Sequence, residues 1–86
     1  MKLKEGFILR KVAGQNLVLP SGGELDPGLM ITLNETGALL WQLLEQGSDA
    51  DALTAALLAE YDVDEATARA NVEHFTAKLK RNGLLV

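Results

Sequence analysis

The chain has 86 residues, of which 48% are hydrophobic and 23% are charged. This mixture is typical of a globular protein and excludes a disordered chain or a collagen-like repeat. A chain of this length buries about 60% of the surface that its unfolded form exposes, so we predict a single domain over residues 1–86. Cysteine is absent, which excludes disulfides, thiolate zinc sites and cysteine nucleophiles.

The net charge is −4, and its distribution is uneven. Residues 45–65 contain seven acidic side chains and no Lys or Arg, whereas residues 2–12 and 69–81 each have an excess of three positive charges. Nucleic-acid binding depends on clustered positive charge, so this distribution argues against it. No apolar run approaches the ~18 residues of a membrane span, and we predict a soluble cytoplasmic protein.

The first third of the chain has the composition of short strands. Residues 7–12 and 17–19 are rich in β-branched and large apolar side chains, and the four residues between them include Gly14 and Asn16, which tolerate positive φ. This pattern predicts a β-hairpin. Residues 29–33 follow a cluster of turn residues, and their alternation predicts a third strand with Leu29, Ile31 and Leu33 packed inward.

Three helices are predicted after residue 33. Asn34 is a favourable N-cap, and the first helix should run to about Gln46 and end at Gly47. Trp41 lies in its broad apolar face, so we assign Trp41 to the core. Ser48 and Asp51 resemble a capping box at the start of a second helix that should span about residues 49–61.

The third helix has the clearest pattern. Asp64 is its expected N-cap, and residues 65–81 show an amphipathic stripe at a spacing of three and four residues. The stripe consists of Ala68, Val72, Phe75 and Leu79. Asn82 and Gly83 should end the helix, leaving residues 84–86 to pack on the core or pair with a strand. The predicted fold is α+β, with a three-stranded antiparallel N-terminal sheet followed by three helices.

No group of residues suggests catalysis or a metal site. His74 is the only histidine, and we expect it to be a solvated helix residue because it has no second ligand at a suitable spacing. The acidic residues lie at expected helix starts and in loops, where burial would not separate their pKa values for acid–base work. We therefore predict that the protein is not an enzyme and needs no cofactor.

One segment is distinctive. It runs from Thr32 to Leu44 with the sequence TLNETGALLWQLL, and it is followed by Gly47. This segment, together with the later pattern that ends in Gly83-Leu84-Leu85, resembles the signature of the pyrroloquinoline quinone synthesis protein D (PqqD) family. The resemblance extends over roughly residues 7–85. One departure is the stretch from Pro20 to Gly28, which looks longer than the usual link between the second and third strands.

The resemblance implies a small winged-helix-like domain that recognises peptides. Such a domain binds the leader of a ribosomally synthesised precursor peptide and presents it to a modifying enzyme, often a radical SAM enzyme. The leader is expected to add as a strand beside the third strand, in the groove against the third helix. The strand residues expected to contact it are Leu29, Met30, Ile31, Thr32 and Leu33. An open strand edge offers unpaired N–H and C=O groups to an extended peptide.

Only one flank of the third helix can face that strand. One flank carries Arg69, Thr76 and Lys80, and the other carries Thr67, Asn71, His74 and Lys78. We favour the flank of Arg69, Thr76 and Lys80, with Val72 at the floor of the groove. A cationic flank would suit an acidic leader segment.

Other functions fit the same pattern of elements. A winged-helix protein could place its third helix in the DNA major groove, although the acidic middle of the chain would repel DNA. A purely structural accessory subunit could dock on a larger enzyme without touching a peptide. A homodimer formed through the third strand would occupy the edge that a peptide needs.

Overall fold

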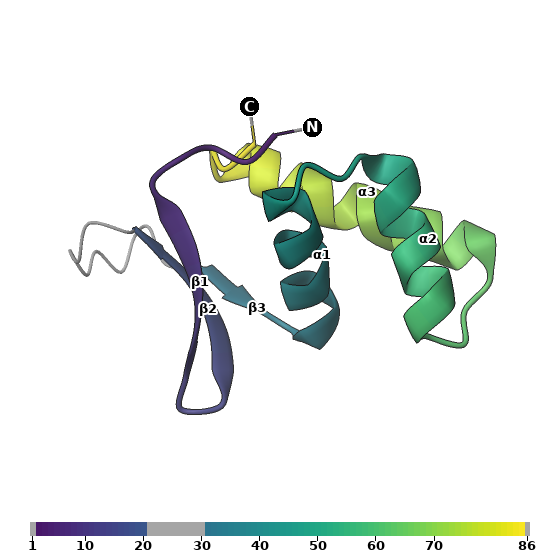
Figure 1. The fold of residues 1–86 in the computed structure, drawn as a ribbon, viewed down its shortest axis with the longest axis horizontal. Helices are drawn as coiled ribbons and strands as arrows, with labels where there is room; N and C mark the ends of the chain where they lie inside the picture. Colours follow the sequence, from purple (N-terminus) through teal and green to yellow (C-terminus); the bar gives the residue numbers. More distant parts are fainter. Residues whose placement is uncertain (1, 21–30, 86) are drawn as a thin grey trace.

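The computed structural model describes residues 2–20 and 31–85. Its elements follow the order β1 (Phe7–Val12), β2 (Gln15–Pro20), β3 (Ile31–Leu33), α1 (Glu35–Glu45), α2 (Ala50–Glu60) and α3 (Glu65–Arg81). The strands form an antiparallel sheet in the order β1-β2-β3, and the helices pack on one side of it (Figure 1). The predicted α+β class, with three strands before three helices, is confirmed.

The hairpin between β1 and β2 turns over two residues rather than the four that we expected. Ala13 and Gly14 both have positive φ, at 52° and 80°. Val12 pairs with Gln15 directly across the turn. Two consecutive positive φ values are the mark of a type I′ turn, whose twist matches that of the flanking strands. Gln15 and Asn16 therefore belong to β2 instead of the loop.

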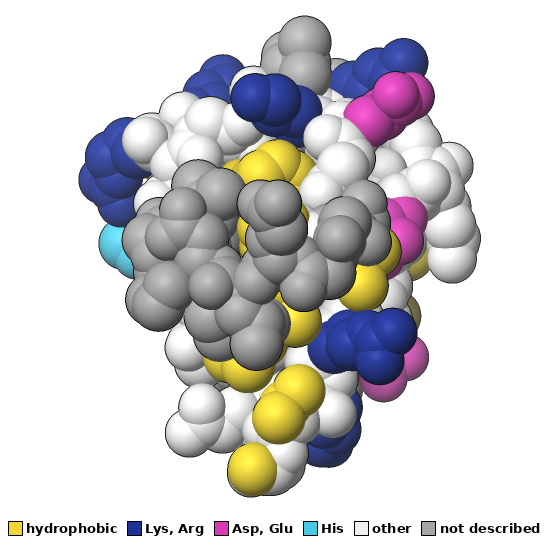
Figure 2. Space-filling model, turned by 90° about the vertical axis from the view of Figure 1, so that its left-hand side faces the viewer, with side chains coloured by type: hydrophobic (Ala, Val, Ile, Leu, Met, Phe, Trp, Pro, Cys, Tyr) yellow, Lys and Arg dark blue, Asp and Glu magenta, His cyan; other side chains and the backbone are white. Residues whose placement is uncertain are grey.

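The sheet has apolar side chains on both faces. Val18 is fully buried against the helices, so its neighbours Leu17 and Leu19 point to the opposite face. On that opposite face Leu19 pairs with Ile8 of β1. The side chains of Leu17, Leu19 and Ile8 are half-buried. Figure 2 views the molecule from the side of the sheet and shows apolar side chains at the surface of this face, with several Lys and Arg side chains toward its margin.

Each helix begins at a side chain that accepts a hydrogen bond from a backbone N–H three residues later. Asn34 accepts from Gly37 at 2.7 Å, and Asp64 accepts from Thr67 at 2.7 Å, as predicted. The cap of α2 is Asp49, which accepts from Ala52 at 2.8 Å, and not the Ser48 of the expected capping box. Asp is as good an N-cap as Ser, so the prediction started one residue early.

Gly47 and Gly83 end α1 and α3 in the same way. Gly83 has a φ of 72°, and the N–H of the following Leu84 bonds the carbonyl of Leu79 at 2.8 Å. Gly47 has a φ of 87°, and the residue after it makes the matching bond to the last turn of α1. This six-to-one bond after a left-handed residue is the Schellman motif.

The core lies between the sheet and the three helices. Its buried members are Val18, Leu33, Leu40, Trp41, Leu44, Leu53, Leu57, Ala68, Val72, Phe75, Leu79 and Leu84. Helix α1 runs through the middle of the fold (Figure 1), as its broad apolar face predicts. Trp41 is a core residue with 1% of its surface exposed, although its indole N–H finds no partner among the described residues.

The two ends of the described chain are joined. Leu3 forms an antiparallel bridge with Leu85, and the N–H of Lys4 donates to the carbonyl of Leu84 at 2.8 Å. The burial of Leu84 confirms the prediction that this tail packs on the core, whereas the bridge of Leu85 is to Leu3, which lies outside the three strands. Residue 86 lies outside the described residues. Within residues 2–20 and 31–85, no helix has the length and hydropathy needed to cross a bilayer.

Substitution of Gly83 tests the left-handed end of α3. A Cβ atom at this position would meet no atom within 4 Å, so the cost of a side chain is purely conformational. We expect Gly83→Ala to lower the free energy of unfolding by about 1–2 kcal/mol and Gly83→Asn to lower it by less, because Asn tolerates positive φ. Urea unfolding measures both. Equal stability of the two variants would contradict the assignment.

The cap of α3 should make stability depend on pH. Hydrogen bonding by Thr67, through its side chain and its backbone N–H, lowers the pKa of Asp64 below the ordinary value of 3.8. A carboxylate whose pKa is lower in the folded state adds stability above its unfolded pKa and loses that contribution as the pH falls through the folded value. We expect Asp64→Asn to keep a capping oxygen but to flatten the acid limb of a plot of melting temperature against pH.

Asp62→Asn is the matched control, because it removes the same charge two residues away. The Asp62 carboxylate accepts no hydrogen bond from any of the described residues. The melting temperature of Asp62→Asn should fall with decreasing pH in the same way as that of the wild type. If the two variants gave the same acid limb, the pH dependence would not come from the cap.

Candidate functional site

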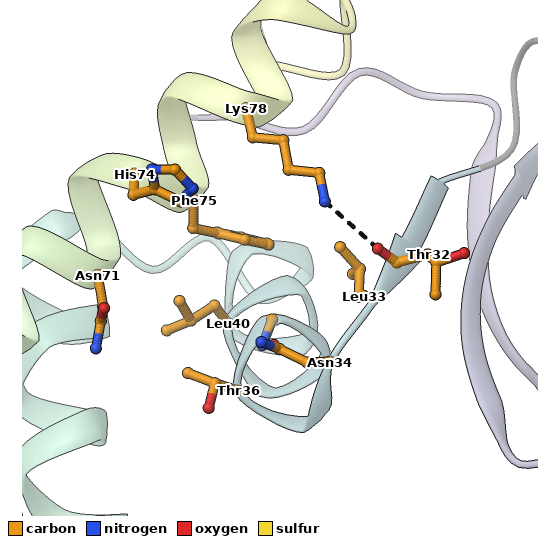
Figure 3. A pocket seen from close by; sticks show the side chains of 10 residues that line it. Thr32, Leu33, Asn34, Thr36, Leu40, Asn71, His74, Phe75 and Lys78 are labelled. Carbon is orange, nitrogen blue, oxygen red and sulfur yellow. Dashed lines mark hydrogen bonds between the residues drawn. The ribbon is translucent and has the colours of Figure 1, made fainter.

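A hollow of about 440 Å³ lies between β3 and α3. The first turn of α1 closes it from below (Figure 3). Its lining comes from β3, the start of α1 and the middle of α3: Thr32, Leu33, Asn34, Thr36, Gly37, Leu40, Asn71, His74, Phe75 and Lys78. We call this hollow the β3–α3 groove.

The floor of the groove is apolar. Leu33, Leu40 and Phe75 line it, and each is a member of the buried core. Gly37 matters here because a Cβ at this position would lie 3.3 Å from Leu33 Cβ and 3.4 Å from the ring of Phe75. The tightest contacts of such a Cβ would be with Asn34 Oδ1, at 3.2 Å, and with Leu33, so its absence chiefly relieves crowding at the junction of β3 and α1.

The upper rim of the groove is polar and belongs to α3. Asn71, His74 and Lys78 follow one another at intervals of three and four residues, which places them on one face of the helix. Lys78 reaches across to β3, where its Nζ donates to the backbone carbonyl of Thr32 at 3.4 Å (Figure 3). Within the part of the chain that the structure describes, none of the residues that line the groove is acidic.

Thr32 presents its backbone to the groove. In an antiparallel sheet the N–H and C=O of one residue point to the same side, and this side alternates along the strand. The carbonyl of Thr32 faces Lys78 on α3, so the N–H of Thr32 also points away from β2. Within the described residues, β3 pairs with β2 alone. The outer edge of β3 at Thr32 therefore faces the groove.

The structure brings together only some of the strand and floor residues expected from the sequence. Ile31, Thr32 and Leu33 form β3, with Ile31 half-buried, Thr32 exposed and Leu33 buried. Leu29 and Met30 lie outside the described residues. Val72 is buried in the core with 2% exposure and does not line the groove, whose floor on α3 is Phe75 instead.

The flank of α3 that we favoured lies away from the groove. Arg69 pairs with Asp51 of α2 at 3.3 Å and with Glu65 at 3.5 Å. The hydrogen bond with Asp51, aided by the charge of Glu65, raises the pKa of Arg69. The hydroxyl of Thr76 donates to the carbonyl of Glu73 at 3.2 Å, and Lys80 is exposed. Neither Thr76 nor Lys80 lines the groove.

The opposite flank takes that place, with Asn71, His74 and Lys78 beside β3. The helical periodicity separates the two flanks correctly but contains no signal for which one faces the strand. That choice is fixed by how α3 crosses β3, and hence by core contacts between residues far apart in sequence.

The part of the chain that the structure describes contains no cluster of side chains that could bind a metal ion. Within residues 2–20 and 31–85, no three His, Asp or Glu side chains come together as a possible metal site. His74 is exposed on α3, as expected for a solvated helix residue. What the groove offers is therefore an open strand edge, an apolar floor and a polar rim with one Lys.

Comparison with known proteins gives both a family and similar folds. The family model of coenzyme PQQ synthesis protein D (PqqD) matches residues 17–85. Among solved structures, TbiB1 in complex with the TbiA(beta) leader peptide is 25% identical, with a TM-score of 0.80 over 99% of this chain and 94% of that one. A lasso peptide synthetase B1 complexed with the leader peptide is 24% identical, with a TM-score of 0.78 over 99% and 95%.

No significant match was found among curated proteins. The family match covers most of β2, the whole of β3 and all three helices, and thus every element that builds the groove. By this match the chain belongs to the family of coenzyme PQQ synthesis protein D.

Proposed function

We propose that the protein is a non-enzymatic module that binds the leader of a ribosomally synthesised precursor peptide and presents it to a modifying enzyme. The observation that carries this proposal is the outward backbone of Thr32, which lies at an open strand edge and faces the β3–α3 groove. Membership of the PqqD family supports it. So does the similarity to TbiB1, whose structure contains a leader peptide.

The groove suits an extended peptide. Main-chain hydrogen bonds to β3 give affinity that depends little on sequence, while side chains that alternate along the peptide enter pockets that select it. Peptide side chains that point inward would meet the apolar floor of Leu33, Leu40 and Phe75. The peptide's polar groups would meet Asn71, His74 and Lys78 on α3.

A modifying enzyme completes the function that we propose. The domain holds the leader, so the enzyme need only act on the segment that extends beyond it, and the family resemblance makes a radical SAM protein the first enzyme to test.

A homodimer through β3 would use the same edge. Peptide binding should therefore dissociate such a dimer, which size-exclusion chromatography with light scattering would detect.

DNA binding is the weaker reading of the same fold. One of the basic residues of α3, Arg69, is already paired with Asp51 and Glu65. The acidic residues of α2 lie next to it, so the helix does not present an uninterrupted positive face.

Isothermal titration with the precursor peptides encoded beside the gene tests the proposal directly. We expect one leader to bind with a Kd below about 100 μM, which corresponds to about −5.5 kcal/mol. The complete precursor and its isolated leader should bind with equal affinity, because the remainder of the precursor contacts the modifying enzyme and not this domain. If no leader binds in this range, the proposed function is wrong.

Thr32→Pro tests the strand edge itself. Proline removes the outward N–H and places its ring where the added strand must lie, yet an edge strand tolerates it because that N–H is not needed within the sheet. We expect leader affinity to fall at least about tenfold, or ~1.4 kcal/mol. Thr32→Val, which keeps the N–H, should bind like the wild type. Circular dichroism checks that both variants fold, and equal binding by both would exclude pairing at Thr32.

A further inference from the structure

Lys78 closes the strand edge in the free protein. Its Nζ lies 3.4 Å from the carbonyl oxygen of Thr32, in the space between α3 and β3 (Figure 3). A strand added to β3 would lie about 4.8 Å from it and would bond the same carbonyl. The ammonium group lies on the side of this carbonyl from which an added strand would approach, so a peptide that pairs there displaces Lys78 from it.

Among residues 2–20 and 31–85, the displaced ammonium group has no acidic partner in its surroundings. Lys78 takes part in none of the ion pairs between described residues, and none of the described residues that line the groove is acidic. Glu35, in the first turn of α1, instead contacts the hairpin through Lys11 at 3.8 Å. The positive charge of the groove is thus left for a ligand to neutralise.

We infer that Lys78 selects leaders that carry an Asp or Glu side chain facing α3, and that the carboxylate replaces the Thr32 carbonyl as the partner of its ammonium group. This inference rests on the proposed function of the groove. The exchange favours acidic leaders because a hydrogen bond between two charged groups is stronger than one to a neutral carbonyl. A leader with no acid at that position leaves the displaced ammonium group without a partner in the groove.

Lys78 and Lys80 form a matched pair for the test. Both are on α3 and carry the same charge, but only Lys78 lines the groove. The variants Lys78→Met and Lys80→Met therefore change the net charge equally. The long-range attraction of an acidic peptide should be reduced alike in both, whereas a direct contact is lost only in Lys78→Met.

The experiment titrates the wild type and both variants with the synthetic leader of the precursor encoded beside the gene. It also uses a series of leaders in which each Asp or Glu in turn is replaced by Asn or Gln. We expect Lys78→Met to weaken binding of the native leader by about two- to fivefold, the range for a partly exposed ion pair, and Lys80→Met to have a smaller effect. One neutralised leader should bind the wild type more weakly by a similar factor, yet bind Lys78→Met as well as the native leader does.

The outcomes separate this inference from the proposed function. If the wild type binds no leader, both are overturned. If the wild type binds a leader but Lys78→Met and Lys80→Met weaken it equally, or if no acidic position of the leader is coupled to Lys78, the groove still binds peptides and only the selection by Lys78 is overturned.

Discussion

The passage from β3 directly into α1 fixes the geometry on which the site depends. Asn34 is the single residue between the two elements, and its side chain holds the N–H of Gly37 at 2.7 Å. Gly37 in turn lies beside Leu33 and the ring of Phe75 of α3. The end of the strand, the start of one helix and the middle of another are thereby packed around one short segment, which holds the edge of β3 beside α3.

Local signals in the sequence predict most of the fold. Asn34, Asp64, Gly47 and Gly83 mark helix ends by hydrogen bonds that span only a few residues, so the neighbouring sequence is sufficient to find them. The start of α2 is ambiguous by one residue because Ser48 and Asp49 are both good caps. The hairpin loop was predicted too long because Gln15 and Asn16 are common turn residues, and only their pairing with β1 assigns them to a strand.

The site was predicted less completely, because it depends on contacts between distant segments. The third strand and the amphipathic helix can both be read from periodicity, and so can the need for an apolar floor between them. The side of α3 that meets β3 cannot be read from periodicity, because the flank with Arg69 and the flank with Lys78 look equivalent on a helical wheel. In the structure, Arg69 turns to the acidic residues of α2 while Lys78 turns to the carbonyl of Thr32.

The attachment of the two chain ends determines what kind of motion can open the groove. Leu84 and Leu85, which follow α3, are bound to Lys4 and Leu3, so the helix end that carries Lys78 is restrained by the segment before β1. Swinging the helix outward would break this junction, whereas rotating the lysine about its side-chain torsions breaks one long hydrogen bond. Rotamer changes of exposed side chains take picoseconds to nanoseconds. In the proposed mode of peptide binding, access to the strand edge therefore requires only a fast rearrangement of one side chain, while the end of α3 stays in place.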